Sequence, residues 1–258
     1  MHESGATDRG DGVRLAWVRT AGRGPTAVFL PGYMSDMTGA KAIETEAFCS
    51  GHGLGCLRLD YSGHGVSGGA FIDGTVGRWT EDALVLIDRL TEGPLVLVGS
   101  SMGGWIALLA ALARPARVVG LIGLAAAPDF TEELMWQAMM PRERTQLEQE
   151  GVLHVPSLYG EPYPVTAALI ADGRTRLLLD KPIPLHCPVR LLHGQRDPDV
   201  PWQTSVRLAD QLQSEDVQVT LVKDGEHRLS RPADLALLRR ALGDLLLRDG
   251  DLLLQNGA

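Results

Sequence analysis

The sequence predicts an α/β fold with a mostly parallel central sheet flanked by helices. Short apolar runs that are typical of buried strands alternate with helical segments along most of the 258 residues. In the middle of the chain, an apolar run from Leu95 to Val98 leads through Gly99-Ser100-Ser101-Met102-Gly103 into an Ala- and Leu-rich helical run. Strands that alternate with helices form parallel sheets, and polar residues that follow such strands gather at one edge of the sheet.

The first half of the chain predicts a β-hairpin followed by alternating strands and helices. Residues 13–19 alternate between apolar and polar, residues 22–25 are typical of a turn, and residues 26–30 form a second, more apolar strand. The further strands are expected at residues 55–59, 95–98 and 118–124, and the helices near residues 38–49, at about residues 76–90 and from Trp105 onward.

Residues 128–186 interrupt this alternation. The segment contains several large apolar side chains, a charged helical run at residues 142–150 and a stretch with several prolines. We therefore expect a small helical cap insertion at residues 128–186, over the carboxyl end of the sheet, within a single domain of residues 1–258. Strands at residues 189–193 and 217–222 and helices at about residues 203–212 and 233–247 are expected to complete the fold.

Composition and charge exclude several classes of partner. The chain is 45% hydrophobic and carries a net charge of −8, which disfavours non-specific attraction to nucleic acid or to anionic lipid. No apolar run approaches the length that spans a bilayer. We therefore expect neither a nucleic-acid partner nor stable membrane insertion.

The N-terminus and the cysteines bear on where the protein resides. The polar and acidic first residues lack the features of signal and transit peptides, which favours a cytoplasmic location. Cys49, Cys56 and Cys187 are odd in number and lack the paired spacing of metal ligands. We interpret them as reduced, mostly buried thiols, and we expect no disulfide and no metal site.

The pentapeptide from Gly99 to Gly103 fits the pattern Gly-x-Ser-x-Gly only with Ser101 at its centre. In this pattern a sharp turn presents the serine hydroxyl above a helix N-terminus, where backbone N–H groups can meet a developing oxyanion. Glycines are needed because side chains two residues either side of the serine would collide. We interpret Ser101 as the nucleophile; the alternative is a glycine-rich turn that binds nothing.

A serine hydroxyl needs a histidine as general base and a carboxylate that orients this histidine. In an α/β architecture the acid and then the histidine follow the serine, each after a later strand. His227 lies just past the last predicted strand and is the candidate base, the alternative being a structural loop histidine. Asp197 and Asp199 both follow an earlier strand, and Asp197 is preferred because Asp199 is better placed to cap the next helix.

The oxyanion hole requires two backbone N–H donors. One belongs to the residue after the nucleophile, Met102, and the other to a loop after an early strand, where Tyr33 is the candidate. Pro31 has no N–H to donate, whereas Gly32 permits a close approach of the backbone. The alternative for these three loop residues is an ordinary turn.

The predicted cap contains large apolar side chains at helical spacing. Met135, Trp136, Met139 and Met140 have the spacing of residues that pack a cap onto the body of a protein, which is the usual role of such residues. We expect one or two of them to line a pocket instead, and we select Trp136 and Met139 as the substrate-binding candidates.

Five groups of residues carry a resemblance to the α/β-hydrolase superfamily over nearly the full length of the chain. They are Ser35-Asp36-Met37-Thr38-Gly39, Asp60-Tyr61-Ser62-Gly63-His64-Gly65 with Ser67, Gly99-Ser100-Ser101-Met102-Gly103-Gly104-Trp105, His193-Gly194 with Asp197 and Val200-Pro201-Trp202, and His227-Arg228. The resemblance implies a catalytic triad of Ser101, Asp197 and His227 that works without a cofactor. Within the superfamily the chain looks most like palmitoyl-protein thioesterases that also cleave acyl glucuronides, which implies a small-molecule acyl ester or thioester, or an S-acylated protein, as substrate.

Two features depart from the pattern of this superfamily. Pro31 stands where many members carry histidine, which leaves the form of the oxyanion loop open. The mitochondrial presequence of animal members is missing, which favours a bacterial-type cytoplasmic enzyme. The alternatives are an acyl-glucuronide esterase or general carboxylesterase, a peptidase, and a non-catalytic ligand-binding protein on the same scaffold. The sequence does not specify an oligomeric state.

Overall fold

The structure of the protein is a computed structural model that describes residues 2–156 and 162–247. Its strands are β1 (His2–Asp8), β2 (Arg14–Thr20), β3 (Arg23–Leu30), β4 (Leu54–Leu59), β5 (Leu95–Ser100), β6 (Val118–Leu124), β7 (Val152–Val155), β8 (Tyr163–Thr166), β9 (Val189–Gly194) and β10 (Val217–Val222). Its α-helices are α1 (Ala40–Gly51), α2 (Val76–Leu90), α3 (Met102–Ala113), α4 (Pro141–Glu150), α5 (Ala167–Arg174), α6 (Gln203–Gln211) and α7 (Pro232–Leu246). A 3₁₀ turn lies at Phe71–Asp73 and a π-helical segment at Thr131–Trp136.

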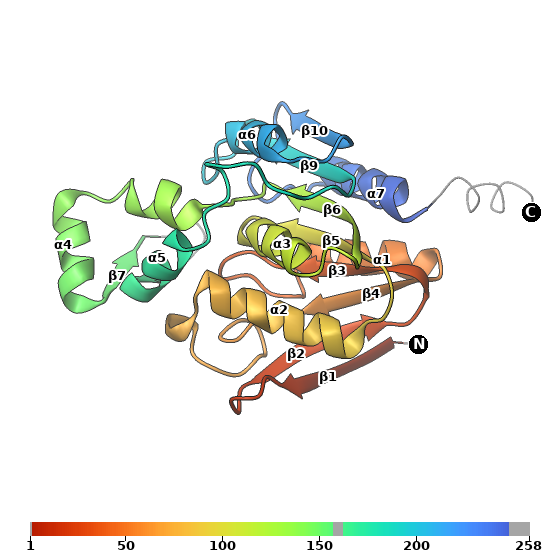
Figure 1. Cartoon of the computed structure of the whole chain (residues 1–258), viewed down its shortest axis with the longest axis horizontal. Helices are drawn as coiled ribbons and strands as arrows, with labels where there is room; N and C mark the ends of the chain where they lie inside the picture. The colour runs from red at the N-terminus through yellow and green to blue at the C-terminus, as the bar shows by residue number, and fades with distance from the viewer. Residues whose placement is uncertain (1, 157–161, 248–258) are drawn as a thin grey trace, which may run out of the picture.

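Most of the described strands form one sheet in the order β1-β2-β4-β3-β5-β6-β9-β10. β2 is antiparallel to both of its neighbours, and the other pairs in this sheet are parallel. The arrowheads in Figure 1 show the shared direction of the central strands. The prediction of a mostly parallel sheet flanked by helices is therefore confirmed.

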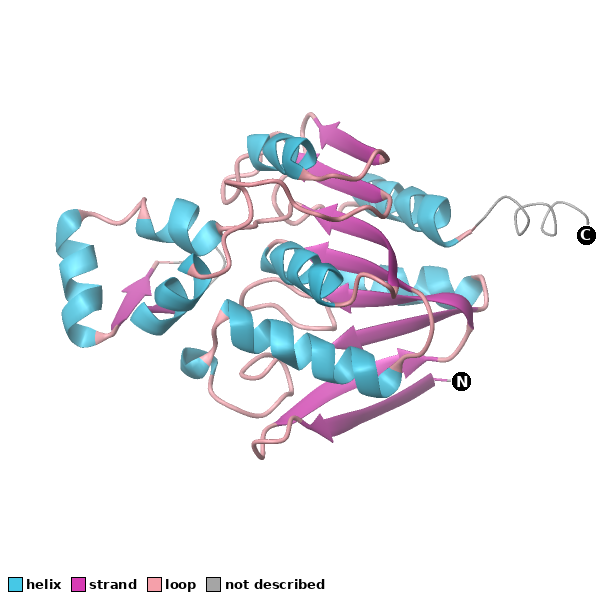
Figure 2. Cartoon of the chain, in the orientation of Figure 1, coloured by secondary structure: helices cyan, strands magenta, loops and turns pink. Residues whose placement is uncertain are grey.

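Helices cover both faces of the sheet (Figures 1 and 2). On one face, α2 and α3 contribute Trp79 and Trp105 to a large buried cluster. On the other face, α1 and α7 pack against each other and contribute Ala42 and Leu242 to a second cluster. The hydrophobic core therefore consists of two layers, with the sheet between them.

The strand that leads to Ser101 shows why the buried strands are continuous apolar runs. In β5, Leu95 and Leu97 belong to the first cluster, whereas Val96 and Val98 belong to the second. All four side chains are fully buried. A strand covered by helices on both faces has no polar side, so an alternating pattern is absent.

Local signals explain several helix ends. Thr75 precedes α2, and its Oγ1 accepts a hydrogen bond from the N–H of Arg78 at 3.1 Å. Helix α4 has Pro141 at its first position and ends at Gly151, which adopts a φ of 78°. These signals are visible in the sequence, which is why the predicted bounds of α2 and α4 lie close to the observed ones.

The predicted hairpin at the start of the chain is wrong. Residues 13–19 and 26–30 contribute to β2 and β3, but β4 lies between these strands and pairs with both. β2 pairs instead with β1, at residues 2–8, which was not predicted. β1 lies at the edge of the sheet, where its mostly polar side chains stay partly exposed, so it lacks the apolar pattern of the central strands.

Helices α4 and α5 and strand β7 of the segment 128–186 lie beyond the carboxyl ends of the central strands (Figure 1), whereas Leu178 and Ile183 pack into the large core cluster. This part of the chain contains the π-helical segment, α4, α5 and an antiparallel pair of short strands, β7 and β8. The strand pair was not predicted, because each strand has only four residues and β8 contains Pro164. The segment has a small cluster of its own, built on Met139, Leu147, Val165 and Ile170. Residues 157–161 of the predicted cap lie outside the described residues.

Two further expectations concern the membrane and the cysteines. Within residues 2–156 and 162–247, no helix is both long enough and apolar enough to cross a bilayer. Cys49 and Cys56 are buried free thiols, and Cys187 is a half-buried one. Burial raises the pKa of the Cys187 thiol to about 11, which keeps it protonated near neutral pH.

Candidate active site

Ser101 lies on a strained turn between β5 and α3. Its φ of 54° is in the left-handed region, and its N–H donates to the Leu124 carbonyl at 2.9 Å. A Cβ on Gly99 would lie 2.3 Å from the Gly103 carbonyl oxygen, and a Cβ on Gly103 would lie 2.0 Å from the Leu30 oxygen. The two glycines are therefore required for the turn to close. Ser101 is partly exposed, whereas the neighbouring serine in β5 is buried.

The structure brings His227 and Asp197 to this serine. His227 follows β10, and its Nε2 lies 3.1 Å from Ser101 Oγ. Its Nδ1 lies 2.7 Å from Asp197 Oδ2, and Asp197 follows β9. The three residues are far apart in the sequence, but parallel strands place their carboxyl ends at one edge of the sheet. The hydroxyl, the imidazole and the carboxylate form one continuous hydrogen-bonded chain.

The carboxylate of Asp197 is buried and accepts hydrogen bonds on both oxygens. Oδ1 accepts from the backbone N–H groups of Asp199 and Val200, each at 2.8 Å. Oδ2 contacts His227 and also His193 Nε2, at 3.2 Å. Burial raises the pKa of this carboxyl, but hydrogen bonds from His193 and His227 outweigh burial and hold the pKa below its ordinary value. Asp197 is therefore a stable anion facing the imidazole.

The structure distinguishes the two aspartates that the sequence offered. Asp197 Oδ2 lies 2.7 Å from His227 Nδ1, and Asp199 donates its backbone N–H to Asp197 Oδ1. Trp202 occupies the N-cap position of α6. Asp197, Asp199 and His227 each offer a ligand atom within 4.8 Å of the others, but the Asp197 and His227 atoms already serve the chain of hydrogen bonds described above.

The loop after β3 lies against the serine. A Cβ on Gly32 would lie 3.3 Å from Ser101 Cβ, so the backbone that carries Tyr33 passes close to the hydroxyl. Tyr61 Oη donates to the Pro31 carbonyl at 3.3 Å and supports this loop from below. Met102 is the first residue of α3. Met102 thus directly follows Ser101 in the chain, and Tyr33 follows the glycine that approaches Ser101.

The side chain of Tyr33 links this loop to the segment 128–186. Its hydroxyl donates to the Pro164 carbonyl of β8 at 2.7 Å, and its ring packs edge-on against Phe130 and Tyr163. Burial raises the pKa of the Tyr33 phenol well above its ordinary value, so the hydroxyl keeps its proton and donates. Tyr33 therefore connects the loop after β3 to the segment 128–186.

The two predicted substrate-binding residues have other neighbours in this structure. Met139 is buried in the small cluster of the segment 128–186, so its side chain packs the interior of this segment. The ring of Trp136 lies under the guanidinium groups of Arg144 and Arg174, at 5.1 and 4.4 Å from the ring centroid. In this conformation both side chains are engaged within the segment 128–186.

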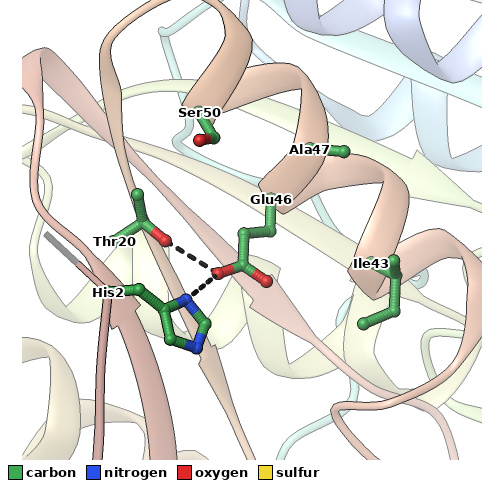
Figure 3. A pocket seen from close by; sticks show the side chains of 6 residues that line it. All are labelled: His2, Thr20, Ile43, Glu46, Ala47 and Ser50. Carbon is green, nitrogen blue, oxygen red and sulfur yellow. Dashed lines mark hydrogen bonds and ion pairs between the residues drawn. The ribbon is translucent and has the colours of Figure 1, made fainter.

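Two surface hollows have linings that do not include the hydrogen-bonded chain. One, of about 390 Å³, is lined by His2, Thr20, Ile43, Glu46, Ala47 and Ser50. Figure 3 shows His2 and Thr20 pointing toward Glu46, at 2.9 and 2.7 Å. The other, of about 170 Å³, is lined by Met34, Ser35, Asp36, Gly63, His64, Gly65 and Phe71, next to the oxyanion loop. The first hollow lies between β1, β2 and α1, and its lining does not include Ser101.

Sequence reasoning missed two residues near the chain of hydrogen bonds. His193 contacts Asp197 from the end of β9, and the signal for it was a histidine four residues before the candidate acid. Lys41 of α1 donates from Nζ to the carbonyl of Arg228, the residue after His227. Burial lowers the pKa of Lys41 to about 8, with the carboxylate of Asp197 opposing this effect. No local pattern in α1 indicates this lysine.

Comparison with known proteins identifies close relatives. Human "Palmitoyl-protein thioesterase ABHD10, mitochondrial" is 44% identical over 241 residues, which cover 93% of this chain and 78% of that protein. The solved structure of mouse alpha/beta hydrolase domain-containing protein 10 is 41% identical, with a TM-score of 0.88, over 94% of this chain and 98% of that chain. A putative hydrolase from Agrobacterium vitis S4 is 42% identical, with a TM-score of 0.91, over 95% and 99%.

The prediction of a cytoplasmic location is wrong, because the curated relatives are named mitochondrial. The prediction rested on the polar, acidic character of the first residues. The structure shows that residues 2–8 form β1, paired along its length with β2. Their composition therefore reflects the edge of a sheet and carries no information about targeting.

The fold and the family match confirm the resemblance that the sequence motifs indicated. Residues 27–236 match the alpha/beta hydrolase family, a range that runs from β3 into α7 and includes Ser101, Asp197 and His227. The two solved relatives extend the match over nearly the whole chain. The chain therefore belongs to the alpha/beta hydrolase family.

Proposed function

We propose that the protein is a serine hydrolase that cleaves acyl thioesters and activated acyl esters through an acyl-enzyme intermediate. The observation that carries the proposal is the hydrogen-bonded chain from Ser101 Oγ through His227 to Asp197, at 3.1 and 2.7 Å. The choice of thioesters is supported by the relatives named palmitoyl-protein thioesterase, at 42–44% identity. The substrate is thus a small acyl ester or thioester, or an S-acylated protein.

In the first step, Ser101 Oγ attacks the acyl carbonyl carbon while its proton passes to His227 Nε2. Asp197 accepts the Nδ1–H of His227, which fixes the tautomer that can take the proton and stabilises the positive ring. The tetrahedral intermediate then expels the thiolate or alkoxide, which receives the proton from His227. Water repeats the sequence on the acyl-serine and releases the carboxylic acid.

The backbone N–H groups of Tyr33 and Met102 stabilise the negative oxygen of the tetrahedral intermediate. Met102 begins α3, so its N–H has no acceptor within the helix, and the positive end of the helix dipole adds to its effect. Gly32 brings the second loop to the other side of Ser101, as an oxyanion hole requires. Pro31 contributes a buried carbonyl that Tyr61 holds, and no donor.

The segment 128–186 acts as a cap over an acyl chain, within a single domain. Its helices α4 and α5 lie beyond the carboxyl ends of the strands, where Ser101 is, and Tyr33 ties the segment to the oxyanion loop. Its own cluster of apolar side chains, which includes Met139 and is bordered by Trp136, supplies the surface that covers the chain once the cap repacks. A thiolate leaves without the protonation that an amine needs, so amides are poor substrates.

The experiment is a hydrolysis screen of acetyl, octanoyl and palmitoyl groups, each presented as a thioester, an aryl ester and an amide. We expect kcat/KM to rank thioester and aryl ester above amide, and octanoyl above acetyl. A fluorophosphonate probe, followed by peptide mass spectrometry, locates the nucleophile. An adduct on Ser100, or a preference for amides, contradicts the proposal; a ligand that stabilises the protein without turnover or labelling favours a binding protein instead.

A further inference from the structure

A second histidine contacts the carboxylate of the proposed triad. We infer that His193, held by Ser205, is a positioning residue that keeps Asp197 oriented and ionised for His227. The inference rests on the proposed function, since it concerns the same serine hydrolase site. Neither His193 nor Ser205 touches Ser101 or the space in front of it; both act through Asp197.

The geometry of His193 is that of a fixed donor. The residue is the second-last of β9 and is completely buried. Its Nε2 lies 3.2 Å from Asp197 Oδ2 and 3.0 Å from the Val200 carbonyl oxygen. A carbonyl only accepts hydrogen bonds, so Nε2 carries the hydrogen and shares it between these two oxygens. His193 thus contacts the loop that carries Asp197 at two points, the Asp197 carboxylate and the Val200 backbone carbonyl.

Ser205 lies at the other nitrogen of His193. Ser205 lies in α6, is completely buried, and has its Oγ 2.7 Å from His193 Nδ1. Because Nε2 is the donor in the neutral ring, Nδ1 accepts the hydroxyl hydrogen of Ser205. The Val200 carbonyl thus selects the tautomer in which Nε2 donates, and the hydrogen bond from Ser205 supports this tautomer and holds the ring in place. A chain of donors runs from Ser205 to His193 and then to Asp197.

The consequence for Asp197 follows from the distribution of donors over its two oxygens. Oδ1 has two backbone donors, whereas Oδ2 has only the two histidines. If His193 no longer donates, Oδ2 depends on His227 alone, and the buried carboxylate becomes more basic and free to turn. His227 then loses its fixed orientation, so the catalytic step slows while substrate binding is unaffected.

The surrounding charges do not provide a substitute for His193. Lys41 of α1 acts on Asp197 through its charge, but its Nζ is engaged with the Arg228 carbonyl. Tyr163 of β8 faces Asp199 and carries no charge near neutral pH, because burial raises its pKa. Loss of the hydrogen bond from His193 is therefore expected to affect the Asp197 carboxylate directly.

The decisive variants are a pair at position 193. In His193→Asn the amide reaches only the place of Nδ1, so contact with Ser205 is retained and the donor to Asp197 is lost. In His193→Gln the amide nitrogen reaches the place of Nε2, so that donor is retained. Ser205→Ala and Ser205→Thr form a second pair, without and with the hydroxyl. His186→Asn, at an exposed histidine in the loop before β9, is the control.

Three measurements are made on the full chain: the rate of fluorophosphonate labelling of Ser101, kcat and KM with an octanoyl thioester, and the pH dependence of both rates. We expect His193→Asn to lose about 10- to 100-fold in labelling rate and kcat, which is the rate equivalent of one hydrogen bond to a charged group. KM stays within about twofold, as for an interaction made only in the transition state. We expect the acidic limb of the pH–rate profile, which reflects the protonation of the coupled acid and base, to move to higher pH.

His193→Gln is expected to recover most of the lost rate and to return the limb to its original pH. Ser205→Ala shows a smaller loss in the same direction, and Ser205→Thr restores it. The inference is overturned if a folded His193→Asn labels at the wild-type rate with an unmoved limb, or if His193→Gln is as slow as His193→Asn. Melting temperatures identify a misfolded variant, in which case the Ser205 pair decides the question by the same criteria.

The outcomes separate this inference from the proposed function. A wild-type protein that is labelled at Ser101 but hydrolyses no ester or thioester contradicts the proposed function, while the labelling rates of the variants still test His193. A wild-type protein that hydrolyses thioesters, with variants that show neither slower labelling nor a shifted limb, contradicts only the role of His193. A wild-type protein without labelling and without turnover contradicts both.

Discussion

The body of the protein, which carries the large sheet, and the proposed cap at residues 128–186 hold their candidate side chains in different ways. In the body, Ser101, Asp197 and His227 each follow a strand of one sheet, and backbone contacts support them. Trp136 and Met139, in contrast, pack on neighbours within the segment 128–186. In the proposed function, the chemistry therefore depends on residues at strand ends, and the choice of substrate on side chains of the cap.

The largest expected effect tests the body. Ser101→Ala removes one partly exposed hydroxyl, so the protein folds while kcat for an octanoyl thioester falls about 10⁴- to 10⁶-fold. The measurement is kcat by thiol release, together with the melting temperature. Ser100→Ala serves as the control, because this serine is buried in β5 and lies outside the hydrogen-bonded chain. Loss of activity in the control alone contradicts the assignment of the nucleophile.

The next effect tests whether strand position selects the acid. Asp197→Asn leaves the imidazole without the acceptor that fixes its tautomer, so kcat falls about 10⁴-fold. Asp199→Asn leaves the backbone N–H that serves Asp197 in place, and it costs less than about tenfold. Steady-state rates of the two variants, compared at one pH, give the ranking. The opposite ranking contradicts the assignment of the acid.

A smaller effect tests the cap. Each methylene that the cap buries contributes about 0.8 kcal/mol, so an octanoyl thioester exceeds a butanoyl thioester by up to about 100-fold in kcat/KM. Trp136→Ala is expected to reduce this ratio, and Met140→Ala, at an exposed methionine, is expected to leave it unchanged. The ratio is measured with matched leaving groups. An unchanged ratio in Trp136→Ala means that the cap selects chain length without this residue.

The stability of the body depends on pH through His64. Burial lowers its pKa to about 4, although a contact with the Ser62 carbonyl opposes this effect. Between pH ~6.5 and ~4 the unfolded chain binds a proton at His64 that the folded protein does not, so the free energy of unfolding falls as pH falls, by on the order of 2–3 kcal/mol. Urea unfolding of His64→Gln should show a shallower pH slope, and the exposed His186→Gln should keep the wild-type slope.

The smallest effect tests one of the contacts between the two regions. Tyr33→Phe removes the hydrogen bond to the Pro164 carbonyl and keeps the ring contacts and the backbone N–H. The free energy of unfolding is expected to fall by about 1 kcal/mol, and kcat for an acetyl ester to stay within about threefold. Urea unfolding and steady-state rates provide the two values. A tenfold loss in kcat means that the hydroxyl acts in the chemistry, beyond its tie to the cap.

The features that backbone geometry requires could be predicted from the sequence. The nucleophile turn needs Gly99 and Gly103, as the close contacts at both positions show, and a buried strand must precede it. The order of the acid and the base follows from the topology of parallel strands. For these reasons the mostly parallel character of the sheet, most of its helices and the candidates Ser101, Asp197 and His227 could be predicted from the sequence.

The remaining features depend on tertiary neighbours that no local pattern encodes. β1 has no apolar alternation because it pairs along one edge only, and β7 and β8 are too short to give a signal. The insertion of β4 between β2 and β3 is a matter of long-range pairing. His193 was visible as a histidine at a strand end, but its contact with Asp197 follows from the turn of the acid loop.

The outermost position of β1 has a consequence for the colloidal behaviour of the protein. β1 covers one edge of β2, where Trp17 packs over Gly5 and donates from its indole to Thr7 Oγ1 at 3.0 Å. A chain trimmed of its first eight residues presents an unpaired edge that carries this tryptophan, and such edges recruit strands from other molecules. The polar residues of β1 thus shield Trp17 and one edge of β2, and we expect a protein without residues 2–8 to self-associate.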